Sequence, residues 1–332
     1  MKYRTILSLL VCILLLGSCH QKSSSTEKMS SEQMLQLLDA KISKNQKDAD
    51  LYYQRGRLLL QMGRVNEAIR DASKAIELKD KKVDYYLLLG DAQFATGNVE
   101  KSYDALHKAL DLDSDNSEAQ LKMGEIAYYS RDFDRAMESL TKVTAKDPNN
   151  RTALFMKSFI YKETGDTANA ITLLRKVCDI YPDYAPAFEE LGIIYSSRHL
   201  PVALEYFNTA LQLDPNNTNT LYAMAMYYQD EKNYEQAENI YKQMLDINSN
   251  SVDAWHNRGY IQLFVYGDYP LAIEYFTQAL MIDPNSLESL TNRGCAHEMN
   301  GNAEAAADDF RAALQIQQGY APAVEGLKRL GK

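Results

Sequence analysis

Small residues recur through this chain at a nearly constant interval, and this repetition constrains the fold more than any other feature. A first series is spaced by 33 to 35 residues: Gly56, Gly90, Gly124, Ser158, Gly192, Ala225, Gly259 and Gly294. A second series follows it by 11 to 13 residues: Ala68, Ser102, Ala136, Ala170, Ala203, Ala237, Ala272 and Ala306. A third follows the second by seven: Ala75, Ala109, Val143, Val177, Ala210, Met244, Ala279 and Ala313. Eight copies in register predict a repeat protein.

Each repeat unit is expected to be a pair of helices, because apolar residues between the markers fall at helical spacing. Glycine and proline, at 15 and 8 of 332 residues, are rarer than the usual combined share of about 12%. The turn inside a unit carries a glycine in five copies: Gly63, Gly97, Gly165, Gly267 and Gly301. The break between units carries a proline in four places, Pro148, Pro182, Pro215 and Pro284, where it stops the second helix. The small residues allow the two helices to cross closely.

A period of 34 residues with these features resembles the tetratricopeptide repeat (TPR) family over about residues 49 to 320. The resemblance implies an all-α fold, a right-handed α-solenoid (superhelix) of about eight helix-turn-helix repeats. The predicted repeats 1 to 8 are residues 49–82, 83–116, 117–150, 151–184, 185–217, 218–251, 252–286 and 287–320. Repeat 5 is one residue short around Arg198 to Pro201 and repeat 7 one long around Tyr266 to Pro270. Both changes are expected in turns.

The two ends of a solenoid need capping helices, since the end repeats have no neighbour. Ser30 and Gln33 form a predicted capping box, which opens an N-terminal capping helix within 31–48. A C-terminal capping helix is predicted within 321–332, with Val324, Leu327 and Leu330 facing inward.

The beginning of the chain has the pattern of a secretory signal. Lys2 and Arg4 precede an apolar run from Ile6 to Leu16, which is too short to span a bilayer core of about 30 Å. Residues 16–19, Leu-Gly-Ser-Cys, resemble the lipobox of bacterial lipoproteins. The resemblance implies a signal peptide at 1–18, acylation of Cys19, and a tether at 19–30. An ordinary cleaved signal and an uncleaved anchor are the alternatives.

The resemblance to lipoproteins also implies a location in the bacterial cell envelope. The residue after the cysteine is not the Asp that retains enterobacterial lipoproteins in the inner membrane, and this favours the outer membrane. Cys178 and Cys295 remain in the mature chain. They lie several repeats apart, too far for a disulfide, which needs Cα atoms within about 7 Å. Both are expected to be free.

Charge and motifs exclude several kinds of function. The formal net charge of −9 argues against a nucleic-acid partner, because neutralising phosphates requires a basic face. Phosphate-binding, dinucleotide, nucleophile-elbow and zincin motifs are absent from the sequence. No cofactor and no metal site are therefore predicted, and the protein is not expected to be an enzyme.

A protein or peptide partner is expected on the first helices of the repeats, which line the concave face in TPR proteins. We number positions from the first-series small residue of each repeat. Positions −3 and +1 supply an apolar and aromatic stripe, and Asn257 and Asn292 form a short asparagine ladder that suits a peptide backbone. The predicted partner-binding residues are Tyr53, Phe155, Phe159, Ile193, Tyr222, Met226, His256, Asn257, Tyr260 and Asn292. The alternative is that some of these side chains only pack between neighbouring first helices.

Together these patterns indicate a non-catalytic scaffold or adaptor that is anchored to a membrane by an N-terminal lipid and binds a partner segment on its concave surface. Two alternatives remain: a periplasmic chaperone for exported polypeptides, and an accessory subunit of an envelope enzyme.

Overall fold

A computed structural model describes residues 29–332, and within this range every regular element is helical. There are 18 α-helices, α2 to α19, one short π-helix, η1, and no strand in the described range. The expected all-α class is confirmed. The predicted signal peptide, Cys19 and nearly all of the tether lie outside the described residues. Between residues 29 and 332, no helix has the length and apolar character needed to cross a membrane.

The chain divides into two compact units, one ending at Ala119 and the other comprising Gln120–Lys332. The helices of the first unit are α2 (Ser31–Lys44), α3 (Ala49–Gln61), α4 (Val65–Leu78), α5 (Val83–Ala95) and α6 (Val99–Leu112). The division falls within α7 (Ser117–Tyr129).

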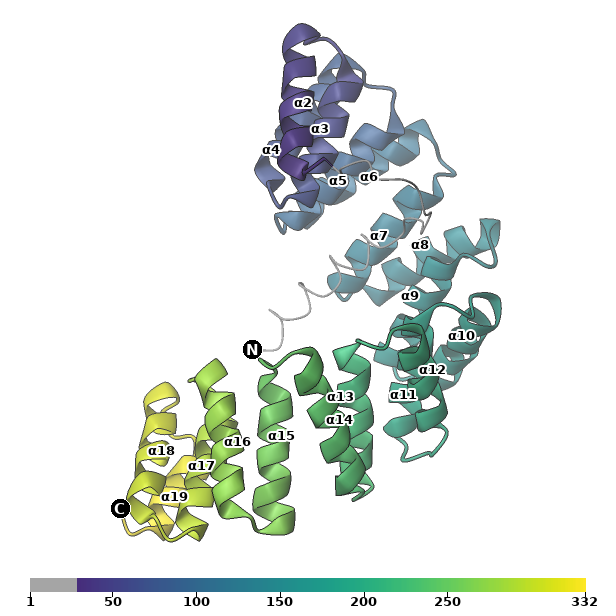
Figure 1. The fold of residues 1–332 in the computed structure, drawn as a ribbon. Helices are drawn as coiled ribbons and strands as arrows, with labels where there is room; N and C mark the ends of the chain where they lie inside the picture. Colours follow the sequence, from purple (N-terminus) through teal and green to yellow (C-terminus); the bar gives the residue numbers. More distant parts are fainter. Residues whose placement is uncertain (1–28) are drawn as a thin grey trace. The chain divides into compact units, whose positions relative to one another are not determined.

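The second unit continues the alternation of first and second helices, which lie side by side in chain order from α13 to α18, with α19 packed against α17 and α18 (Figure 1). Its helices are α8 (Phe133–Lys146), α9 (Arg151–Glu163), α10 (Thr167–Ile180), α11 (Ala185–Ser196), α12 (Ala203–Leu213), α13 (Thr218–Asp230), α14 (Tyr234–Ile247), α15 (Val252–Ile261), η1 (Gln262–Tyr266), α16 (Tyr269–Ile282), α17 (Leu287–Met299), α18 (Ala303–Ile316) and α19 (Ala321–Arg329). Cys178 and Cys295 are both free, as expected.

The capping box at the start of α2 is present. The Ser30 hydroxyl accepts a hydrogen bond from the Gln33 amide at 3.2 Å, and the Gln33 side chain accepts one from the Ser30 amide at 2.8 Å. Two amides that have no partner inside the helix are thereby satisfied. At the other end of the chain, α19 forms as predicted, but Val324 is 44% exposed. The expectation that Val324 faces inward was wrong.

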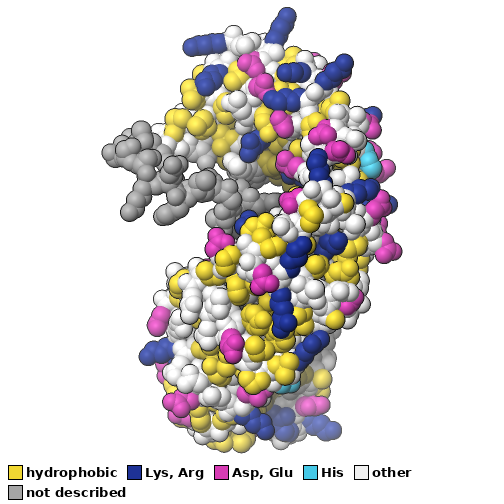
Figure 2. Space-filling model, turned by 90° about the vertical axis from the view of Figure 1, so that its right-hand side faces the viewer, with side chains coloured by type: hydrophobic (Ala, Val, Ile, Leu, Met, Phe, Trp, Pro, Cys, Tyr) yellow, Lys and Arg dark blue, Asp and Glu magenta, His cyan; other side chains and the backbone are white. Residues whose placement is uncertain are grey.

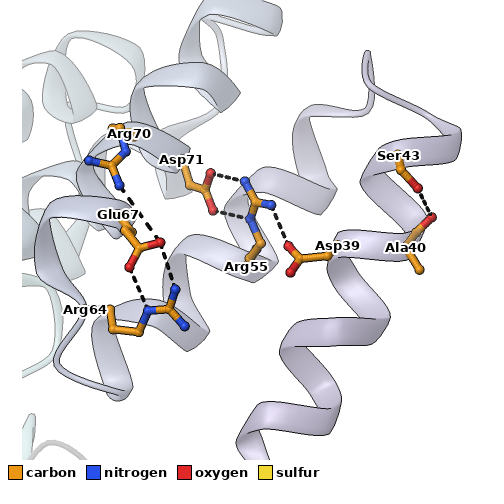
Figure 3. Close-up of polar contacts among 8 residues, drawn as sticks. All are labelled: Asp39, Ala40, Ser43, Arg55, Arg64, Glu67, Arg70 and Asp71. Carbon is orange, nitrogen blue, oxygen red and sulfur yellow. Dashed lines mark hydrogen bonds and ion pairs between the residues drawn. The ribbon is translucent and has the colours of Figure 1, made fainter.

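Charged side chains join α2, α3 and α4 (Figure 3). The Arg55 guanidinium on α3 donates two hydrogen bonds to Asp71 on α4, at 2.6 and 2.7 Å, and one to Asp39 on α2, at 2.7 Å. Asp71 is buried, so the paired geometry offsets the loss of its hydration. Repeat 8 repeats this contact at equivalent positions, because Arg293 donates to both carboxylate oxygens of Asp309.

The close crossing of helices within a repeat explains the first small-residue series. In repeat 5, a Cβ atom added to Gly192 on α11 would lie 2.5 Å from Phe207 Cδ1 on α12. Phe207 is fully buried and has no room to move. Gly294 has the same relation to Phe310 in repeat 8, at 2.7 Å. Glycine leaves room for the rings of Phe207 and Phe310 against the first helix, whereas repeat 6 has Ala225 at this position and the buried Tyr241 on its second helix.

The turn inside each repeat uses the left-handed backbone region, whether or not glycine is present. Gly63, Gly97, Gly165, Gly267 and Gly301 have φ angles between 68° and 85°. The equivalent residues of repeats 3, 5 and 6 also have positive φ angles, of 60°, 55° and 59°, at Arg131, His199 and Lys232. Sequence reading identified only the glycines.

The two length changes are accommodated differently. The missing residue of repeat 5 lies in the turn, and α12 begins at Ala203 without a side-chain cap. The extra residue of repeat 7 was expected in the turn around Tyr266 to Pro270. That expectation was wrong. The extra residue is absorbed before Gly267, where the end of the first helix widens into the π-helix η1, and the Asp268 amide donates to the Gln262 carbonyl at 3.0 Å.

Candidate functional site

The predicted residues at position −3 contact the next first helix along the chain. In the first unit, the ring of Tyr53 on α3 lies 5.4 Å from that of Tyr85 on α5. In the second unit, His256 Nδ1 on α15 lies 2.9 Å from the Ser289 hydroxyl on α17. These side chains join successive repeats, which is the packing role that the sequence left open.

Phe155 and Phe159 form an aromatic pair on α9. Their ring centroids lie 4.8 Å apart, edge to face, and Phe155 also meets the ring of Tyr184 at 5.2 Å. Phe155 is only 9% exposed, so packing accounts for most of its surface. Phe159 keeps part of its ring accessible, with the Lys162 ammonium 4.6 Å from its centroid. Of this pair, Phe159 is better placed to contact a partner.

Ile193 and Tyr222 are half-buried against the core of repeats 4 to 7, and Met226 is half-buried as well. The Met226 sulfur accepts a hydrogen bond from the Tyr241 hydroxyl at 3.2 Å. Burial raises the pKa of Tyr222, and a hydrogen bond with Asn257 opposes that rise. Tyr222 and Asn257 thus meet across α13 and α15, which places two predicted residues together.

The two asparagines of the predicted ladder already have partners. The Asn257 amide donates to the Asp253 carbonyl of its own helix at 2.9 Å, and Asn292 Nδ2 lies 3.5 Å from His256 Nε2. Burial lowers the pKa of His256, whose ring lies against Phe276 at 5.4 Å. The side-chain NH2 groups of both asparagines are thus engaged within the protein, one of them with His256, and only their side-chain carbonyl oxygens are left to accept hydrogen bonds from a peptide.

A carboxylate interrupts the stripe at position −3 of repeat 5. Glu189 Oε2 accepts hydrogen bonds from Asn217 Nδ2 and the Thr220 hydroxyl, both at 2.9 Å. Burial raises the pKa of Glu189, and the neighbouring Glu190 raises it further. This carboxylate links α11 to the start of α13.

Tyr260 differs from the other predicted residues, because it is 38% exposed. Its ring contacts that of Phe264, with centroids 4.7 Å apart and the ring planes tilted by 50°. Phe264 and Tyr266 are each 54% exposed, and sequence reading did not include them among the site residues. The extra residue of repeat 7 was the signal that could have found them, because it changes the helix in which they lie.

The arrangement is suited to binding. His256 and Ser289 are within hydrogen-bond distance, but Ser289 is fully buried and offers a substrate no access. No group of three or more potential metal ligands lies together in residues 29–332. On the side of the molecule seen in Figure 2, basic, acidic and apolar side chains are interspersed.

Four family models match the chain. The cytochrome c-type biogenesis protein H TPR domain matches residues 82–187. Three models described as tetratricopeptide repeat match residues 49–82, 195–257 and 267–321.

Curated relatives share part of this chain. Superkiller protein 3 of Schizosaccharomyces pombe is 28% identical over 140 residues, 40% of this chain and 10% of the relative. A probable UDP-N-acetylglucosamine–peptide N-acetylglucosaminyltransferase, SPINDLY of Arabidopsis thaliana, is 33% identical over 88 residues, 26% of this chain and 10% of the relative. The chain thus spans about a tenth of the length of these relatives.

Solved structures share the fold at low sequence identity. The APC/C hetero-tetramer Cut9–Hcn1 aligns with a TM-score of 0.55 and 18% identity, over 92% of this chain and 61% of that chain. A tetratricopeptide repeat protein from Parabacteroides merdae aligns with a TM-score of 0.55 and 17% identity, over 75% of this chain and 99% of that chain. The helix pairs, these structures and the family models across the chain agree that it is an α-solenoid built from tetratricopeptide repeats.

Proposed function

We propose that this protein is a non-catalytic adaptor, lipid-anchored in a bacterial cell envelope, that holds a segment of a partner protein against its first helices. Tetratricopeptide repeats are in general scaffolds for protein–protein interaction, and their fold is generally non-catalytic. The anchor, the location and the partner are the specific parts of the proposal.

The row of side chains at position +1 carries the binding proposal. Phe159, Ile193 and Met226 are half-buried and Tyr260 is exposed, on four successive first helices of the second unit. Apolar side chains that recur at one position of adjacent helices form a surface for an extended or helical segment. The −3 side chains lie beside this row and hold the helices together.

The leader sequence supports the anchor. Two or three acyl chains on Cys19, as the lipoprotein resemblance implies, would hold the protein at a membrane, whereas one chain binds reversibly. Cys19→Ser should release the protein from the membrane fraction of the native host. Retention of this variant in the membrane would contradict the anchor and leave the binding proposal standing.

Cross-linking in the native cell tests the binding face. A variant with Phe159→Gln, Ile193→Gln and Met226→Gln should lose the cross-linked partner that the unmodified protein recovers. The matched control carries Leu213→Gln, Ile247→Gln and Met281→Gln, three exposed residues from successive second helices. Both variants are first compared by far-UV circular dichroism, so that a loss of partner is not a loss of helix. Equal recovery by both variants would refute the proposed face.

The same experiment separates the adaptor from its alternatives. An adaptor recovers one or a few proteins. Capture of many unrelated exported chains, together with similar affinity for several unfolded polypeptides, would favour a chaperone. Recovery of a single enzyme whose activity depends on this protein would favour an accessory subunit.

A further inference from the structure

All the exposed aromatic side chains of the described residues lie within one short segment. Tyr260, Phe264 and Tyr266 are 38%, 54% and 54% exposed, and every other Tyr, Phe or Trp between residues 29 and 332 is buried or half-buried. We call these three residues the aromatic patch. Tyr260 and Phe264 touch each other, and Tyr266 follows two residues later; several exposed aromatic side chains in one short segment are typical of a binding site.

The π-helix at the end of α15 keeps the aromatic patch exposed. Within η1, Leu263 is buried against Phe276 and its neighbours, and Gln262 donates to Glu238 Oε1 at 2.7 Å. These inward contacts fix the rotation of the segment, so Phe264 points away from the core. A π-helical turn is rare and often marks a functional site.

The patch lies in the most acidic part of the chain. Residues 185–286 contain 13 Asp and Glu residues and four Lys and Arg residues, which gives this stretch a net charge of −9, equal to that of the whole chain. Arg258, the basic residue closest to the patch in sequence, donates to Glu238 at 2.8 Å and to the Tyr275 hydroxyl at 2.6 Å. It is therefore engaged elsewhere.

Other aromatic rings of the second unit already have cations. Lys162 lies 4.6 Å from the centroid of Phe159, and Arg151 lies 4.6 Å from that of Tyr184. Within residues 29–332, no Lys or Arg lies over the rings of the aromatic patch. The exposed parts of the three rings thus have no cation of the described residues over them and lie in an acidic stretch of the chain, which is the setting that favours a cation from another molecule.

From this we propose that the aromatic patch docks a cationic segment of a partner protein, with Arg or Lys side chains over the exposed rings and the acidic repeats around it attracting the segment. This inference rests on the proposed scaffold function and names the chemistry of its partner. The same acidity disfavours the other occupants. A nucleic acid, an anionic membrane surface and a second copy of this chain would each bring further negative charge to the patch.

Fluorescence anisotropy with short labelled peptides tests the proposal on the full-length protein in a neutral detergent. The probe is a peptide of alternating Arg and Ser, and its counterpart has Glu in place of Arg. We expect the Arg peptide to bind, the Glu peptide not to bind, and added salt to weaken binding by screening. Absence of binding by the Arg peptide, or equal binding of both peptides, would overturn the proposal.

Variants then locate the site. Replacing Tyr260, Phe264 and Tyr266 together by Ser should weaken binding of the Arg peptide about tenfold or more, as loss of aromatic anchors does. Tyr260→Phe with Tyr266→Phe keeps the rings and should keep the affinity. A control with Leu213→Ser and Met281→Ser removes exposed apolar residues elsewhere and should bind as the unmodified protein does. If the serine variant retains full affinity, the patch is not the site.

Failure of this inference is distinguishable from failure of the proposed function. If the cellular partner is still lost on changing the +1 row while the serine variant binds the Arg peptide normally, only the aromatic patch is excluded. If the unmodified protein recovers no partner by cross-linking, the scaffold proposal fails whatever the peptides do.

Discussion

Replacing Gly192 by Ala should destabilise repeat 5, although the same change in most helices is favourable. The new methyl group would lie 2.5 and 2.6 Å from Phe207 Cδ1 and Cε1, well inside normal contact distance. Overpacking of a buried site costs about 1–3 kcal/mol. Alanine in place of glycine inside a helix stabilises the folded state by about 1 kcal/mol. The expected net loss is therefore up to about 2 kcal/mol of unfolding free energy.

Gly56→Ala is the matched control. The methyl group would first meet Leu88 Cδ2 at 3.0 Å and Asp71 Cβ at 3.2 Å. The position that Phe207 occupies in repeat 5 is held by Ala72 in repeat 1, so no ring lies in the way. The gain in helix propensity should then offset a small adjustment of Leu88, and the change should be between zero and about 1 kcal/mol in favour of folding.

Hydrogen exchange read by mass spectrometry is the suitable assay, because repeat arrays need not unfold in one step. Peptides from α11 and α12 should lose protection in Gly192→Ala, while peptides from α3 and α4 should keep it in Gly56→Ala. Adding Phe207→Leu to Gly192→Ala should restore part of the loss, since repeat 4 has leucine at this position, Leu174, together with Ser158, which carries a Cβ atom, in place of the glycine. Equal protection in the two alanine variants, or no rescue by leucine, would refute the packing argument.

Three further changes test other parts of the fold. Lys232→Gly should raise the urea midpoint of unfolding by an amount that corresponds to about 0.5–1 kcal/mol of unfolding free energy. Relief of the left-handed strain at φ 59° should exceed the cost of the greater entropy that glycine gives the unfolded chain. A lower midpoint would show that Lys232 is not strained. The lowered pKa of His256, caused by burial, means that the unfolded chain binds a proton first, so stability should fall as the pH drops below about 6.5. His256→Gln should reduce that slope, and an unchanged slope would exclude His256 as its source. Burial raises the pKa of Cys178 to about 12, so this thiol should resist alkylation at mildly alkaline pH until the protein is unfolded. Rapid labelling of the native protein at Cys178, detected by mass spectrometry, would contradict its burial.

The sequence was most informative where the repeat imposed the same packing many times. The first series predicted the close helix crossings, because a small residue such as Gly192 lies at the crossing point of the two helices in each repeat. The capping box at Ser30 and Gln33 was also predicted and confirmed. These features depend on a few residues near one another in the chain, so local pattern was sufficient.

Features that depend on several side chains at once were not predictable. The left-handed turn at Lys232 could not be predicted, because no glycine marks it in the sequence. The flanking helices impose the conformation on a lysine instead. The extra residue in repeat 7 was recognised, but whether a turn or a helix would absorb it depended on how Gln262 and Leu263 pack. The same reason limits the site. His256 was placed on the predicted face, whereas its engagement with Ser289 depends on the spacing of two repeats.

The link from Glu189 to Asn217 and Thr220 has a mechanical consequence. The shortened α12 packs less extensively on α13 than α14 does on α15, so the joint between repeats 5 and 6 relies more on these two hydrogen bonds. A pulling force along the second unit should therefore separate repeat 5 from repeat 6 before it unfolds either repeat. Protonating Glu189 would soften the joint further, because a neutral carboxyl accepts hydrogen bonds less strongly than a carboxylate. The contact between repeats 5 and 6 would then separate reversibly under force and re-form when the force is removed.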